Sequence, residues 1–94
     1  MKYLVIIEKG ENNYSAFSPD VPGCVTVGDT LEITLVNMKE ALDLYFEDAI
    51  EKNDTTVPQP KGLEFYIKQG IFKAGEIAED YFITHIEIQL PAVV

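Results

Sequence analysis

The chain has 94 residues, of which 47% are hydrophobic, and it carries a formal net charge of −9 at pH 7. This length allows one domain, residues 1–94, with a single modest core that needs neither a disulfide nor a metal. Sixteen acidic side chains stand against seven lysines and no arginine. We therefore expect no direct binding of nucleic acid by this chain alone, because a polyanion would be repelled. The acidity either attracts a basic protein partner or only keeps the chain soluble.

Residues 2–8 predict a first strand. The continuous apolar run Tyr3-Leu-Val-Ile-Ile7 is typical of a central strand that is covered on both faces. Five apolar residues before Glu8 are too few for a signal sequence or a membrane span. The single cysteine, Cys24, cannot form an internal disulfide and favours a reducing compartment. These observations predict a cytoplasmic protein without a membrane segment.

Two more strands should follow the first one closely. Residues 9–13 contain Gly and Asn and predict a hairpin loop, after which residues 14–18 return as a strand. Pro19, Pro22 and Gly23 predict a tight turn, and residues 24–27 make a third short strand. We expect these three strands to form an antiparallel meander.

Residues 30–52 predict one long helix. Asp29 is expected to cap its start, with Glu32 completing a capping box. An apolar stripe alternates steps of three and four along the helix, through Leu31, Leu35, Met38, Leu42, Tyr45 and Ala49. Further apolar residues widen this stripe, which is consistent either with a helix set deeply onto the sheet or with a contact between copies. The remaining face is acidic and is expected to be solvated.

The last third of the chain is less clearly patterned. Pro58 and Pro60 stop the helix. Residues 61–80 allow either a short helix ended by Gly70 or a strand at residues 65–67, and periodicity does not separate the two. Residues 81–90 predict a final strand that Pro91 ends.

The predicted fold class is α+β. An antiparallel β-meander, a long α-helix, an uncertain short helix and a final β-strand should make a two-layer structure with one main helix on a sheet. Such a structure leaves the other sheet face open. We expect self-association to cover it, and the chain to be a homo-oligomer.

A string of residues in the first two thirds of the chain resembles the HicB-like antitoxins. The string comprises Phe17-Ser-Pro-Asp-Val-Pro-Gly-Cys24, then Gly28-Asp-Thr-Leu-Glu32, and Glu40-Ala-Leu42 in the helix. The resemblance implies a degenerate ribonuclease H fold in which the last strand lies parallel to the first. It also implies the neutralisation of a small basic mRNA-cleaving toxin. Longer family members add a DNA-binding segment, for which residues 91–94 leave no room, so DNA binding is not expected.

No constellation of residues predicts catalysis. Cys24 needs a base to act as a nucleophile, and the single histidine, His85, cannot complete a zinc site with it. A ribonuclease H-like site needs several carboxylates around two metal ions. The candidates Glu8, Asp20 and Asp29 stand at a strand end, in a turn and at a helix cap. We expect no catalytic, cofactor or metal site.

The leading hypothesis is therefore a non-enzymatic binding module that occludes a basic toxin. The residues expected to contact this partner are Tyr14, Phe17, Asp20, Pro22 and Cys24. One alternative is a metal-dependent nuclease or hydrolase that uses Glu8, Asp20 and Asp29. Another is a homo-oligomeric domain without a toxin partner.

Overall fold

The computed structural model describes residues 1–52, 57–73 and 75–89, and it has the α+β architecture that the sequence predicts. Its elements, in chain order, are β1 (Lys2–Lys9), β2 (Tyr14–Phe17), β3 (Val25–Gly28), α1 (Leu31–Glu51), α2 (Leu63–Gln69) and β4 (Tyr81–Glu87). The last strand is shorter than the predicted residues 81–90, and Leu90 lies outside the described residues. Neither described helix is long and apolar enough to cross a membrane.

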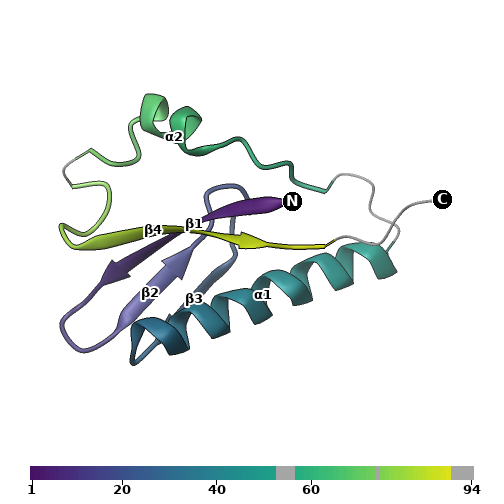
Figure 1. Cartoon of the computed structure of the whole chain (residues 1–94), viewed down its shortest axis with the longest axis horizontal. Helices are drawn as coiled ribbons and strands as arrows, with labels where there is room; N and C mark the ends of the chain where they lie inside the picture. The colour runs from purple at the N-terminus through teal and green to yellow at the C-terminus, as the bar shows by residue number, and fades with distance from the viewer. Residues whose placement is uncertain (53–56, 74, 90–94) are drawn as a thin grey trace.

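The four strands form one sheet in the order β3-β2-β1-β4 (Figure 1). The predicted meander is confirmed, since β1 pairs with β2 and β2 with β3, both antiparallel. The parallel placement of the last strand is wrong, because β4 runs antiparallel to β1. The chain runs along the sheet twice before β4. Helix α1 first runs toward the start of β1, where Phe46 packs against Tyr3. The segment that follows α1 then runs back toward Glu8 at the other end of β1. The hydrogen bonds from the Tyr3 hydroxyl to the Pro58 carbonyl and from the Ala78 N–H to Glu8 mark this second traverse.

Helix α1 covers one face of the sheet with a narrow buried stripe. Its buried residues are Thr34, Met38, Leu42, Phe46 and Ala49. Met38, Leu42 and Phe46 belong to one core cluster with Tyr3, Val5 and Ile7 of β1. The ring centroids of Tyr3 and Phe46 lie 5.0 Å apart. The predicted stripe was wrong at one position, since Tyr45 is 38% exposed and Phe46 takes its place in the core. Alternation along β1 therefore places Tyr3, Val5 and Ile7 on the sheet face that α1 covers, and this explains why these three residues are buried.

The start of α1 differs from the prediction by one residue. Thr30 is the N-cap, and its Oγ1 accepts a hydrogen bond of 3.1 Å from the Ile33 N–H. Asp29, the predicted cap, is exposed. Either side chain is a good N-cap. The Thr30 carbonyl accepts the first backbone hydrogen bond of the helix, from the Thr34 N–H at 3.0 Å, and a second hydrogen bond from the Thr34 hydroxyl at 2.7 Å.

The other sheet face is covered by the chain itself, at least over β1. Leu4 and Ile6 point to this face and are almost fully buried. Helix α2 and its flanking segments lie on this side, opposite α1 (Figure 1). Of the two possibilities for this segment, the helix is confirmed: it ends at Gly70, whose left-handed φ of 83° suits glycine. The prediction that this face stays open was therefore wrong over the central strand.

Candidate functional site

A loop between β2 and β3 is anchored to the core by one carboxylate. Asp20 is only 6% exposed. Its oxygens accept hydrogen bonds from the Leu4 N–H at 3.0 Å, the Lys61 N–H at 3.0 Å and the Tyr66 hydroxyl at 2.7 Å. One side chain thus joins β1, the loop and the α2 segment. Charge-assisted hydrogen bonds of this kind satisfy a buried carboxylate and hold the loop rigidly.

The loop exposes its tip while burying its base. The Val21 N–H donates to the Ser18 carbonyl and the Cys24 N–H donates to the Val21 carbonyl, both at 3.1 Å, so the chain makes two successive turns. The Val21 side chain is fully buried. Pro22 and Gly23 are exposed between these turns. The loop is therefore held in place by its own hydrogen bonds and by the Asp20 carboxylate.

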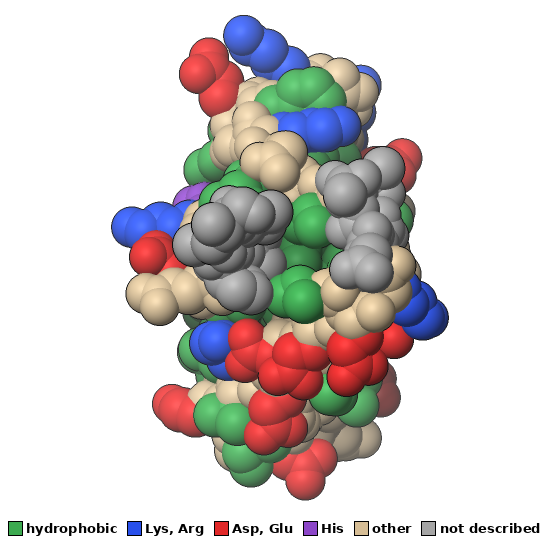
Figure 2. All heavy atoms as spheres, turned by 90° about the vertical axis from the view of Figure 1, so that its right-hand side faces the viewer, with side chains coloured by type: hydrophobic (Ala, Val, Ile, Leu, Met, Phe, Trp, Pro, Cys, Tyr) green, Lys and Arg blue, Asp and Glu red, His purple; other side chains and the backbone are tan. Residues whose placement is uncertain are grey.

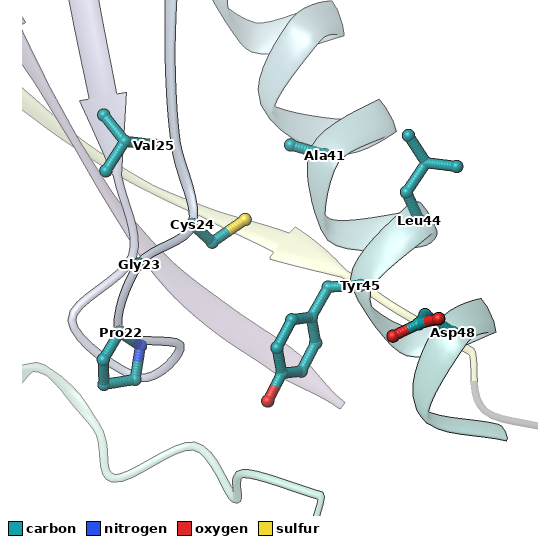
Figure 3. Close-up of a pocket in the computed structure, with 8 residues that line it drawn as sticks. All are labelled: Pro22, Gly23, Cys24, Val25, Ala41, Leu44, Tyr45 and Asp48. Atoms are coloured by element: carbon teal, nitrogen blue, oxygen red, sulfur yellow. The ribbon is translucent and has the colours of Figure 1, made fainter. Parts of the chain in front are cut away.

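An open groove of about 530 Å³ lies between this loop and α1 (Figure 3). We call it the loop–helix groove; it is lined by Pro22, Gly23, Cys24 and Val25 on one side and by Ala41, Leu44, Tyr45 and Asp48 on the other. The helix residues follow the spacing i, i+3, i+4 and i+7, so they form one stripe beside the core stripe. The lining is mostly apolar with a single carboxylate, and Leu44 is 65% exposed.

The helix that forms one wall of the groove is strongly acidic. Its acidic residues in this half are Glu40, Asp43, Glu47, Asp48 and Glu51. Figure 2 shows Asp and Glu side chains gathered where α1 lies, with hydrophobic side chains among them. Two exposed ion pairs, Lys39–Asp43 at 2.8 Å and Lys52–Asp48 at 3.0 Å, lie along the helix. Such exposed ion pairs are weak, and acidic residues outnumber lysines in this half of the helix. The groove is therefore an apolar site beside an acidic helix surface.

The residues that line the groove are suited to binding another molecule and not to catalysing a reaction. Figure 3 shows the Cys24 sulfur pointing toward α1, and burial raises the pKa of this thiol above its ordinary 9.0. The neutral thiol is a poor nucleophile. His85 is on β4 at the other edge of the sheet from β3, so it is not placed to activate Cys24.

The carboxylates proposed for a metal-dependent alternative are engaged elsewhere. Glu8 accepts a hydrogen bond of 2.8 Å from the Ala78 N–H, Asp20 is the buried anchor described above, and Asp29 is exposed before α1. Among the described residues, no three His, Cys, Asp or Glu side chains are grouped so that they could hold a metal ion. Glu8 and Asp20 thus make hydrogen bonds to different segments, and the three acids are not grouped in a shared site.

The structure brings together two of the five residues predicted to contact a partner. Pro22 and Cys24 line the loop–helix groove. Asp20 is buried beneath the loop, where it shapes the groove wall without facing it. Tyr14 and Phe17 are half-buried on opposite faces of β2. A role for any of the five in binding stays a prediction.

The sequence reasoning missed the helix wall of the groove. Ala41, Leu44 and Asp48 were absent from the predicted site, and Tyr45 was assigned to the core. A signal was present, because these positions make a second stripe with helical spacing next to the core stripe. Only the folded loop shows that this stripe has an opposite wall.

Comparison with known proteins gives consistent relatives. A phage protein, the uncharacterized 14.9 kDa protein in the rep-hol intergenic region of Haemophilus phage HP1, is 36% identical over 90 residues. That match covers 96% of this chain and 62% of the phage protein. Antitoxin HicB 2 of Photorhabdus laumondii is 36% identical over 69 residues, covering 69% of this chain and 48% of that protein. The chain therefore spans less than two thirds of the length of either relative.

Solved structures share the fold. The N-terminal domain of Burkholderia pseudomallei antitoxin HicB superposes with a TM-score of 0.80 at 19% identity, covering 96% of this chain and 100% of that chain. A chain of the HicA3 and HicB3 toxin-antitoxin complex superposes with a TM-score of 0.71 at 24% identity, covering 96% of this chain and 100% of that chain. The sequence model of the family described as the HicB_like antitoxin of bacterial toxin-antitoxin systems matches residues 3–90. This match spans nearly the whole chain, and the chain belongs to the HicB-like antitoxin family.

Proposed function

We propose that this chain is an antitoxin that binds a small basic mRNA-cleaving toxin and occludes its RNA-binding surface. The carrying observation is the apolar loop–helix groove set in an acidic helix face, in a chain of net charge −9. Membership of the HicB-like antitoxin family supports this role. So does the likeness in fold to a chain from a toxin-antitoxin complex.

The mechanism follows from charge. A protein that cleaves mRNA must present cations to the phosphate backbone. The acidic face of α1 is complementary to such a surface, so it attracts the toxin and competes with RNA for the same cations. The groove then receives an apolar side chain of the toxin, which supplies affinity that charge alone does not. Occupation of its RNA-binding surface leaves the toxin inactive.

In this proposal the chain works without catalysis. It acts in the cytoplasm, where mRNA and the toxin meet, and it needs neither a cofactor nor direct contact with nucleic acid. We also infer that it self-associates, since apolar side chains remain exposed on its strands and helices.

The test is co-expression with any small basic protein that is encoded next to the gene. We expect a tagged chain to retain this basic protein at low salt, and the purified complex to leave an mRNA substrate intact. The isolated chain, incubated with Mg²⁺ or Mn²⁺ and RNA, should cleave nothing. Failure to retain a basic partner at low salt would contradict the antitoxin role, and metal-dependent cleavage that EDTA abolishes would favour a nuclease.

A further inference from the structure

Strand β4 is an open edge of the sheet. It pairs with β1 alone among the residues that the structure describes. Next to the strand, Met1 and Ile88 exchange both backbone hydrogen bonds at 2.8 Å, and the Lys9 N–H donates to the Asp80 carbonyl at 2.9 Å. Antiparallel pairing alternates, so the backbone of even-numbered residues of β4 faces β1. The N–H and C=O groups of residues 81, 83, 85 and 87 therefore face outward.

This edge lacks the usual protection against pairing. Natural edge strands are blunted by charge, proline or short length. Residues 81–86 contain no Asp, Glu, Lys, Arg or Pro. Tyr81, Phe82 and Ile83 are 38%, 45% and 40% exposed, on both faces of the strand. The opposite edge differs, because β3 has only four residues and lies beside the acidic helix α1.

We propose that β4 pairs with β4 of a second copy, antiparallel about a two-fold axis at Thr84. The two four-stranded sheets would then form one continuous sheet of eight strands, 4 + 4. A centre at Thr84 is the register that pairs the whole strand, residues 81–87, with itself. It also sets Phe82 opposite Ile86 of the second copy on one face, and Ile83 opposite His85 on the other, so that the exposed Phe82 and Ile83 side chains gain cross-strand neighbours.

The distribution of charge is compatible with a second copy at this edge. Two chains of net charge −9 repel each other. Helix α1 packs against β2 and β3, so the two acidic helices would lie at the far ends of the joined sheet. The one acidic residue of β4, Glu87, stands opposite Lys2 in the register of β1 and β4. Pairing at the β4 edge thus keeps the two acidic helices apart.

This inference deepens the proposed self-association and does not depend on toxin binding. The central Thr84 pair would be a non-hydrogen-bonded pair, whose Cα atoms are about 4.5 Å apart, and a disulfide spans Cα separations of about 4.4–6.8 Å. We expect Thr84→Cys to form a disulfide-linked dimer under mild oxidation. Thr26→Cys is the matched control, since Thr26 is also half-buried but lies on the other edge strand, and it should stay uncrosslinked.

A second measurement keeps the inference testable without cysteines. Light scattering of the wild-type chain should give the mass of two 10.5 kDa chains, 21 kDa. Ile83→Lys should halve this mass, whereas Val25→Lys on β3 should leave it unchanged. A dimer that survives Ile83→Lys, or equal crosslinking at positions 26 and 84, would overturn this interface while leaving self-association in place. A monomeric wild type would overturn both, and neither result bears on toxin capture.

Discussion

At the scale of single residues, Asp20 holds the molecule together. Its carboxylate accepts three hydrogen bonds from donors that are far apart in the chain, and the Tyr66 hydroxyl stands 46 residues away. Reasoning from sequence identified Asp20 as a turn residue and a candidate contact. It could not identify the buried role, because the donors come from β1 and from a segment without clear periodicity.

Replacing Asp20 with Asn tests this role. The amide keeps the size of the side chain but removes the charge, and its NH₂ group faces other donors. We expect the free energy of unfolding to fall by about 2–3 kcal/mol, measured by urea denaturation. Tyr66→Phe, which removes one donor, should cost less, about 1 kcal/mol. A change near zero for Asp20→Asn would show that the buried network contributes nothing to stability.

The same contact predicts a response to alkaline pH. Burial, and then the hydrogen bond to Asp20, raises the pKa of Tyr66 well above its ordinary 10.0. Above pH 10 the unfolded chain loses this proton while the folded chain keeps it, so stability present below pH 10 is lost as the pH rises further. We expect the free energy of unfolding to fall above pH 10, and less steeply in Tyr66→Phe. Tyr3 and Cys24, whose pKa values are also raised, would maintain part of the slope. Identical slopes in both proteins would contradict this assignment.

At the scale of elements, some structure was predictable and some was not. The apolar run of β1 and the period of α1 fix those elements, and the proline-glycine turn fixes the meander. The direction of β4 was missed because it depends on where residues 57–80 cross the sheet, which no local pattern encodes. The groove itself was not predicted: Pro22 and Cys24 on its loop side were predicted only as partner contacts, and its helix wall depends on the packing of α1.

The contact between β3 and α1 is close enough to require glycine. A Cβ at Gly28 would lie 2.5 Å from the Thr34 Oγ1 and 2.7 Å from the Thr34 backbone nitrogen. Because a backbone atom cannot rotate away, Gly28→Ala must push β3 from the helix. We expect it to lower the free energy of unfolding by about 1–3 kcal/mol, measured by thermal or urea denaturation. Val27→Ala, at an exposed neighbouring position, should change it by less than about 0.5 kcal/mol. Equal small effects would show that β3 and α1 separate freely.

At the scale of the whole molecule, charge should control how fast a partner is found. Exposed charges are screened beyond about 8 Å at physiological ionic strength. We expect the association rate with the proposed basic toxin to fall steeply as salt increases, while the dissociation rate changes little. Glu40→Gln combined with Glu47→Gln should reduce both the rate at low salt and its salt dependence. Stopped-flow or surface binding measurements would check this, and a salt-independent rate would show that the acidic face has no steering role.

The most direct measurement titrates the toxin's mRNA cleavage with wild-type chain and with two variants that carry the same substitution. Leu44→Lys places a cation in the loop–helix groove, at a side chain that is 65% exposed. Ile67→Lys places one on α2, at a side chain that is 56% exposed, on the other side of the sheet. We expect wild type and Ile67→Lys to abolish cleavage at equal stoichiometry, and Leu44→Lys to need at least a tenfold excess. Equal inhibition by all three proteins would contradict the claim that the toxin binds at the loop–helix groove.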